Sequence, residues 1–286
     1  MMNASETKKN NFSILVVLYG KDFHKSKTLN ILNEKFTLKE GTSLFVVNNG
    51  PCALSLDSPL INELKDNFLE LNFIEYLDNK PLSKIYNEFI SSTKSHYYII
   101  FDDDSCPEES YFNHLEEITE DLCLPRIKSK DDGLIYYPCI DMKPVIMDSV
   151  VDINSAMSIS SGLVISESLA LNLQKHYSDI FDERYCLYGI DTSFFFRLRK
   201  LGASYCAISA TCAGDITHSL SRVTQNQTDF RIRERLYDVA ITTRWYSVNY
   251  GYKPFMRKLL ANLIKFRFKF VVVLISTYFK GKHPRT

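Results

Sequence analysis

The 286-residue sequence predicts an α/β protein with a mostly parallel sheet that is covered by helices on both faces. Short continuous apolar runs occupy residues 12–18, 44–47, 71–76 and 97–101, and each is typical of a buried strand. Between them, apolar residues recur every three or four positions, as in residues 82–90, which indicates helices. Alternation of the two favours a parallel sheet, because each connection returns across one of its faces.

The second half of the sequence is less regular. Residues 160–165 are expected to form another strand. Residues 191–201 predict a helix that ends at Gly202, and residues 231–250 predict a further helix. Beyond these, the sequence is apolar and basic together.

Charge is distributed unevenly along the chain. The formal net charge is zero, but residues 222–286 contain fourteen Lys or Arg and three Asp or Glu, a net charge of +11. Residues 1–221 therefore carry −11. We expect an α/β domain over residues 12–250 and a basic, amphipathic helical segment over residues 251–286, and the asymmetry suggests an anionic partner for the latter.

The C-terminal segment predicts contact with a membrane surface. Residues 252–286 contain nine Lys or Arg and no Asp or Glu. Their apolar run, residues 270–279, is about half as long as a membrane-spanning helix. This composition is typical of interfacial helices, which anionic headgroups attract, and it fits a membrane better than a nucleic acid. The alternative is a helix that packs on its own domain.

Cysteines and the N-terminus favour a cytoplasmic location. The seven cysteines are scattered and form no CxxC pair, which indicates free thiols rather than a zinc site or a disulfide framework. Residues 1–11 are polar and lack the apolar core of a signal peptide. We therefore expect a protein on the inner face of the cell membrane.

Polar clusters follow three of the predicted strands. Tyr19 follows the first, Asn48 the second, and Asp102, Asp103 and Asp104 the fourth. Carboxyl ends of parallel strands meet at one edge of the sheet, where such folds bind ligands. Adjacent carboxylates repel one another, and the oxygen-preferring ions Mg²⁺ and Mn²⁺ relieve that repulsion. The alternative is a solvated acidic turn that caps the next helix.

Two more residues could carry chemistry. Asp191 precedes an apolar helix, where it serves either as an N-cap or as a general base that faces the same edge. His218 can ligate an ion such as Mn²⁺, although a lone histidine is more often structural.

Five segments in order resemble family 2 glycosyltransferases of the GT-A fold, particularly the bacterial rhamnosyltransferase-like branch. The resemblance covers residues 13–250. The first part is the strand end at residues 17–20, and the second is residues 46–51, which are similar to the family's V-D-N-x-S turn. Residues 78–87 are similar to its N-x-G…N segment, and residues 101–104 are similar to its D-x-D signature. The last part, residues 181–202, is similar to the stretch F-D-E-x-[FY]-F-x-Y-x-x-D…R-x-x-x-G.

The resemblance implies a metal-dependent enzyme. Asp104 and His218 would hold Mg²⁺ or Mn²⁺, and Asp102 or Asp103 would contact the nucleotide ribose or metal-bound water. Asp191 matches the second carboxylate of the family's acidic pair, which is the catalytic base. The first carboxylate of that pair is absent here, where the chain has an isoleucine.

The resemblance also assigns Tyr19, Asn48 and Asn79 to donor binding. Asn48 stands where the family usually has an Asp that reads the pyrimidine base. An amide oxygen can still accept a hydrogen bond from the N3–H of uracil or thymine, which favours a UDP- or dTDP-linked sugar.

The expected activity is inverting transfer of a sugar from a nucleoside-diphosphate donor to a hydroxyl of a saccharide, lipid-linked acceptor in bacterial surface polysaccharide synthesis. The cation would stabilise the leaving diphosphate, and the base would contribute roughly 10²–10⁴-fold. Because Asn48 and Ile190 depart from the family pattern, the alternative is a non-catalytic sugar-nucleotide-binding or membrane-scaffold protein of the same fold. A phosphatase with an aspartate nucleophile fits less well, because the acidic triplet follows the fourth strand and not the first.

Overall fold

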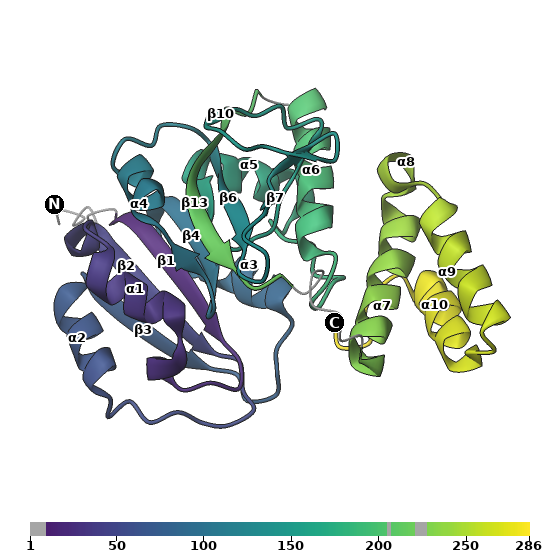
Figure 1. Cartoon of the computed structure of the whole chain (residues 1–286), viewed down its shortest axis with the longest axis horizontal. Coiled ribbons are helices and arrows are strands. Elements are labelled where there is room, and N and C mark those ends of the chain that lie inside the picture. Colours follow the sequence, from purple (N-terminus) through teal and green to yellow (C-terminus); the bar gives the residue numbers. More distant parts are fainter. Residues whose placement is uncertain (1–9, 205–206, 221–227) are drawn as a thin grey trace, which may run out of the picture.

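A computed structural model describes residues 10–204, 207–220 and 228–286. An α/β part contains the long sheet, and a group of helices lies beside it (Figure 1). The strands of the long sheet are β1 (Asn10–Leu18), β2 (Thr42–Asn48), β3 (Glu70–Glu75), β4 (Ser95–Asp102), β5 (Cys106–Pro107), β6 (Leu122–Ser129), β7 (Ile135–Tyr137), β10 (Ser149–Val150), β12 (Leu163–Ser166) and β13 (Ala210–His218).

Most of the sheet is parallel. Its order is β10-β13-β6-β12-β4-β1-β2-β3, and β3, β2, β1 and β4 all run in one direction. β12 is antiparallel to both of its neighbours, β4 and β6, whereas β13 is parallel to β6. A separate small sheet is formed by β8 (Cys139–Ile140), β9 (Lys143–Pro144) and β11 (Ala156–Met157).

Helices cover both faces of the long sheet, as the alternating pattern predicted. Successive side chains of a strand point to opposite faces, so Ile14 and Val16 enter one core whereas Leu15 and Val17 enter the other. The first core is closed by α1 (Lys27–Lys35), α2 (Pro59–Asn67) and α4 (Glu109–Glu116). The second is closed by α3 (Leu82–Ser92), α5 (Glu167–Tyr177) and α6 (Ile190–Ser204).

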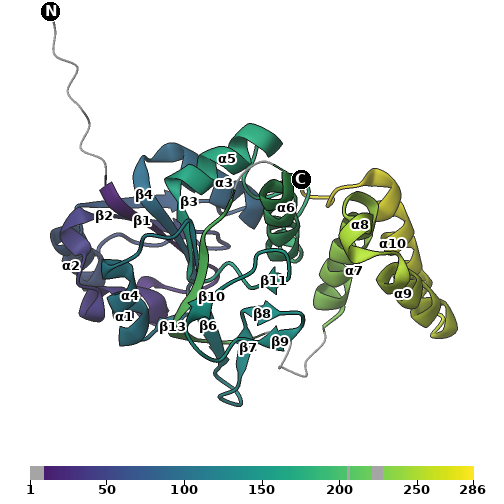
Figure 2. The same ribbon diagram turned by 90° about the horizontal axis from the view of Figure 1, so that it is seen from above.

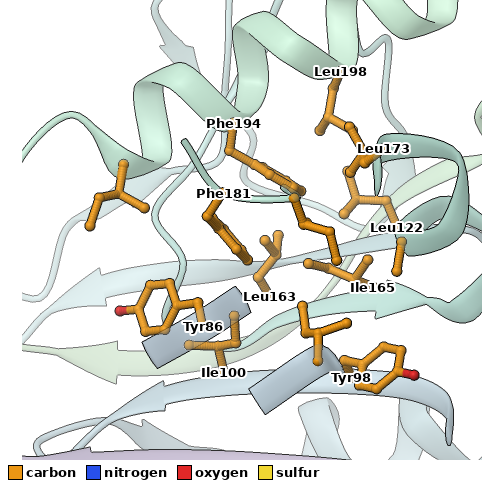
Figure 3. Packing of buried hydrophobic residues seen from close by; sticks show 14 of the residues in the cluster. Tyr86, Tyr98, Ile100, Leu122, Leu163, Ile165, Leu173, Phe181, Phe194 and Leu198 are labelled. Carbon is orange, nitrogen blue, oxygen red and sulfur yellow. The ribbon is translucent and has the colours of Figure 1, made fainter. Parts of the chain in front are cut away.

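Aromatic packing in the second core fixes the segment that precedes α6. Figure 3 shows Phe194 of α6 and Phe181 lying above the sheet residues Ile100 and Leu163. The rings of Phe181 and Phe194 stack with their centroids 4.9 Å apart, and Phe181 also meets the ring of Tyr86 edge-on at 5.1 Å. Phe181 and Phe194 are fully buried, so the start of the segment that resembles the family motif is part of the core.

The helical group has a core of its own. It consists of α7 (Asp229–Trp245), α8 (Ser247–Tyr250), α9 (Lys253–Ile264) and α10 (Phe268–Lys280), and it lies beside α6 in both views (Figures 1 and 2). Its buried residues are Leu236, Val239, Ala240, Phe270 and Leu274. None of the helices in the described ranges is long and apolar enough to cross a membrane.

Two expected helix ends are wrong. Gly202 lies inside α6, which continues to Ser204, and its backbone does not adopt the left-handed conformation of a C-cap glycine. The helix expected over residues 231–250 is interrupted at Tyr246, which separates α7 from the short α8.

Candidate functional site

The acidic triplet and His218 meet because of one short strand pair. The turn after β4 leads directly into β5, and β5 pairs antiparallel with the end of β13. Pro107 lies opposite Ile216, so the turn that carries the triplet rests against the last residues of β13. His218 is the final residue of that strand.

Asp102, Asp104 and His218 form a cluster that could hold a metal ion. Each offers one ligand atom, and these three atoms lie within 4.8 Å of one another. His218 Nδ1 is 3.2 Å from Asp104 Oδ1, and its Nε2 is 3.6 Å from Asp102 Oδ2. Two carboxylates and an imidazole fit a Mn²⁺-type ion, and Mg²⁺ accepts the carboxylates.

The surroundings of Asp102 change the titration of its carboxylate. Burial raises the pKa of Asp102 to about 6, against the opposing effect of His218 and with a further rise from Asp104. The side chain keeps 40 % of its surface accessible, so surrounding protein desolvates the carboxylate while a ligand can still reach it. A bound cation would favour its charged form.

Asp103 points to another part of the chain. Its carboxylate pairs with the ammonium group of Lys21, and its Oδ2 accepts a hydrogen bond of 3.4 Å from the backbone N–H of Tyr19. Burial raises the pKa of Asp103, and Lys21 partly offsets that rise. Asp103 therefore ties the loop after β1 to the triplet, and its contact with a nucleotide stays a prediction.

Asn48 and its neighbour Asn49 are placed differently. The side-chain amide of Asn48 donates to Cys52 O and to Glu75 Oε1, each at 2.8 Å, and its Oδ1 accepts from the Gly50 N–H. An amide oxygen has a second lone pair, so base recognition by Asn48 stays a prediction. Asn49, and not Asn48, is among the residues that line the cavity described below.

Asp191 lies in the first turn of α6, which begins at Ile190, and is therefore not its N-cap. Its Oδ1 accepts a hydrogen bond of 3.1 Å from the backbone N–H of Ser160. Nearby, burial raises the pKa of Tyr86 well above its usual range, and Asp102 and Asp191 add to the rise. The Tyr86 hydroxyl therefore stays protonated close to both carboxylates.

Gly189 allows α7 to approach the loop that precedes α6. Its φ of +89° is unfavourable for other residues, and a Cβ there would lie 2.5 Å from Asp238 Oδ1 and from the Tyr185 ring. Tyr185 in turn shares a 2.9 Å hydrogen bond with Thr242 of α7. The loop before α6 is thus held between the α/β part and the helical group.

A cavity of about 600 Å³ joins these groups. Among the predicted site residues, those that line it are Tyr19, Asn79, Asp102, Asp103, Asp104, Asp191 and His218. Aspartates at the ends of β4 and the start of α6 therefore share one space, as expected for the edge where the parallel strands end.

Several lining residues were not predicted from the sequence. Tyr188 lies within the segment that resembles the family motif, which could have indicated it. Phe230 and Arg231 come from α7, and Arg285 comes from the last residues of the chain. Nothing in the sequence near these three indicates that they reach the cavity.

No protein-family model and no curated protein matches the sequence. Its fold is nevertheless similar to solved structures of TarS from S. aureus. For TarS 1–349 the TM-score is 0.56 at 13 % identity, over 96 % of this chain and 93 % of that chain. The same fragment in complex with UDP-GlcNAc gives a TM-score of 0.54 at 13 % identity, over 81 % of this chain and 66 % of that one.

A longer TarS chain gives a TM-score of 0.54 at 13 % identity and 82 % coverage of this chain. Only 44 % of that TarS chain is covered, so this chain spans less than half of its length. At such low identity the likeness establishes the fold. The predicted GT-A arrangement, a mostly parallel sheet flanked by helices, is confirmed.

Proposed function

We propose that this chain is a metal-dependent, inverting glycosyltransferase that moves a sugar from a nucleoside diphosphate to a hydroxyl of a saccharide acceptor. The proposal depends on one observation: the Asp102–Asp104–His218 cluster and the Asp191 carboxylate line the same cavity. Likeness to TarS, whose structures include complexes with UDP-GlcNAc and with UDP, supports a nucleotide-sugar donor.

The reaction needs two groups at opposite ends of the reacting bonds. The bond between the sugar C1 and the phosphate oxygen breaks, a bond between C1 and the acceptor oxygen forms, and the hydroxyl proton passes to Asp191. A cation held by Asp102, Asp104 and His218 would supply Lewis-acid stabilisation for the leaving diphosphate. A single base suits one displacement, which inverts the configuration at C1.

The backbone around Asp191 suits a general base. The Ser160 N–H donates to Oδ1 and so orients the carboxylate, as a general base requires. The neighbouring Tyr86 hydroxyl remains protonated, so it can donate to an oxygen of a bound sugar.

Donor turnover tests the function. A thermal-shift screen of UDP- and dTDP-sugars with Mn²⁺ or Mg²⁺ identifies the donor, because a ligand of the native state raises its apparent stability. dTDP-rhamnose belongs in the panel because of the sequence resemblance. Release of the nucleotide is then followed with soluble and lipid-linked saccharides. Donor binding without turnover on any acceptor would favour the non-catalytic alternative.

We also propose that the protein works on the inner membrane face with a lipid-linked acceptor. The end of α9, the turn after it and the start of α10, residues 263–269, support this, because all seven of these residues are exposed. We call these residues the membrane tip; they are Leu263, Ile264, Lys265, Phe266, Arg267, Phe268 and Lys269. Four apolar and three cationic side chains suit the boundary between acyl chains and anionic headgroups.

α10, whose first two residues belong to the membrane tip, also exposes apolar side chains. α10 buries Phe270 and Leu274 against α7, whereas Val272 and Phe279 are 65 % and 71 % exposed on the other side. An exposed apolar surface of this kind is unusual for a helix that faces only water. A lipid-linked acceptor would then reach the enzyme by diffusion within the membrane.

A further inference from the structure

Residues 281–286 leave the helical group and return to the α/β part; we call them the strap. In both views the chain leaves α10 and ends close to α6 (Figures 1 and 2). Gly281 makes the turn with a φ of +73°, and its carbonyl accepts a 2.7 Å hydrogen bond from Trp245 Nε1. This left-handed conformation favours glycine, and a Cβ at this position would also lie 2.8 Å from Nε of the flexible Arg244 side chain.

His283 anchors the strap on two sides. Its backbone N–H donates to Arg184 O at 2.9 Å, and its ring lies edge-on to the Tyr237 ring at 4.4 Å. Ring Nδ1 accepts from the Arg285 N–H at 3.1 Å, so the proton of the neutral ring is on Nε2, which donates to Glu234 Oε1 at 3.3 Å. Both members of this pair are about 95 % buried.

This anchor aims Arg285 at the cavity. Arg285 Nη1 donates to the carbonyl oxygen of Asn79 at 2.9 Å, and Arg285 and Asn79 both line the cavity. Asn79 also accepts a hydrogen bond from the Asn49 side chain. The guanidinium therefore lies beside the loops that follow β2 and β3, and it has five N–H groups, of which this contact uses one.

The side chains that line the cavity include more acidic than basic groups. Five aspartates line it, at positions 102, 103, 104, 191 and 238. The arginines and lysines that line it, within the described residues, are Arg231 and Arg285. A nucleoside diphosphate is itself anionic, so a single divalent cation leaves repulsion between the substrate and the remaining carboxylates. Arginine binds phosphate through paired N–H donors.

We propose that the strap closes the donor side of the cavity and that Arg285 is a binding residue for the donor diphosphate. The assignment rests on the proposed function, because it requires a nucleoside-diphosphate substrate. Arg285 would then be a donor-binding residue that lies 206 positions after Asn79, the residue it contacts.

The experiment compares UDP, dTDP and uridine as probes in the presence of Mn²⁺, by calorimetry with the full chain. Arg285→Ala is expected to weaken UDP or dTDP binding about tenfold and to leave uridine binding unchanged, because uridine has no phosphate. Arg285→Lys keeps a point charge and should recover part of the loss. Lys282→Ala is the matched control, since this exposed cation is on the same strap but does not line the cavity.

The outcomes separate this inference from the proposed function. Failure of the wild-type chain to bind any of the three probes would reject the nucleotide-sugar function itself. Normal wild-type binding, with Arg285→Ala equal to wild type for UDP and dTDP, would overturn only the role of Arg285. Equal losses for uridine and UDP would also overturn it, because they would indicate a distorted pocket. Unchanged melting temperatures show that the variants are folded.

Discussion

His218 Nδ1 lies 3.2 Å from Asp104 Oδ1, which joins the last residue of β13 to the turn after β4. The imidazole is 8 % exposed and also lies 3.2 Å from the Ser105 hydroxyl. Ser105 is hydrogen bonded to Ser161, whose hydroxyl accepts from the Asp102 N–H. A row of short polar side chains beneath the cluster thus sets the ring orientation before any ion is bound.

The first prediction concerns this pair. Asp104→Ala removes one of three candidate ligands, so Mn²⁺-dependent binding of UDP or dTDP should be lost while the melting temperature without metal stays close to wild type. Asp131→Ala, which removes an exposed carboxylate from a neighbouring loop, is the control. Calorimetric titration with and without Mn²⁺ checks the result, and retention of metal-dependent affinity in Asp104→Ala would place the ion elsewhere.

Asp191→Asn separates catalysis from binding. Asparagine keeps an oxygen that can accept from the Ser160 N–H, so the local structure should persist. It cannot take a proton, and transfer should fall roughly 10²-fold or more with donor affinity little changed. Single-turnover rates and donor affinity are measured side by side; near-wild-type rates would exclude Asp191 as the base.

The third prediction concerns the ion pair between Arg126 and Asp215, which should make the stability of the protein depend on pH in acid. Arg126 Nε and Nη2 donate to the two Asp215 oxygens at 2.9 and 2.8 Å, and both side chains are largely buried. These hydrogen bonds lower the pKa of Asp215. Because the folded pKa is below the unfolded value of about 3.9, the stabilisation is complete above about pH 4 and is lost as the pH falls through the folded pKa.

Asp215→Asn should therefore destabilise the protein at pH 7 by about 1–3 kcal/mol, since the buried guanidinium loses a charged partner. The difference from wild type should shrink below about pH 4. Urea denaturation at a series of pH values measures it. A difference that is constant from pH 7 to pH 3 would show that the charge of Asp215 is not the cause.

The membrane tip gives a fourth prediction. Replacing Lys265, Arg267 and Lys269 with Gln should weaken binding to anionic vesicles at least about tenfold, because each cation near the surface contributes about 1 kcal/mol. Added salt should have a similar effect on the wild type. Co-sedimentation with anionic and with zwitterionic liposomes provides the measurement.

Matched substitutions strengthen that test. A triple variant at the exposed Lys25, Lys35 and Lys65 changes the net charge equally without touching α9 or α10. Equal pelleting of both triple variants with anionic vesicles would reject the membrane tip as the contact surface. A truncation after residue 251 is a poorer choice, because it would expose Leu236 and Val239, which α10 covers.

The sequence predicted the elements in which local pattern and tertiary packing agree. β1, β2 and β4 consist mainly of buried apolar residues, and continuous hydrophobicity is what a strand covered on both faces requires. β3 was also found from its apolar run, but it is the edge strand of the sheet, and its residues are half-buried or exposed rather than buried. β12 was placed only approximately, and β8, β9 and β11 have two residues each, too few for any period to appear. The helix end predicted at Gly202 was wrong, because a glycine serves as a C-cap only where its backbone becomes left-handed.

The same distinction between local pattern and tertiary contact applies to the prediction of the site residues. The acidic triplet was found because it lies at the end of a strand, and Asp191 because it lies within a recognisable motif. Arg285 was missed because its approach to Asn79 depends on how α10 ends and on the His283 anchor, neither of which has a local signature. Contacts between distant segments are set by the whole fold and not by a pattern in either segment.

The strap begins at Gly281, the C-cap of α10, and α10 itself starts within the membrane tip. A displacement of α10 at a bilayer would therefore be transmitted through Gly281 and His283 to Arg285. If Arg285 binds the donor, membrane attachment and donor affinity are thermodynamically coupled, and the coupling acts equally in both directions. In an enzyme arranged in this way, donor affinity would change on membrane attachment, and donor loading would change membrane affinity by the same factor.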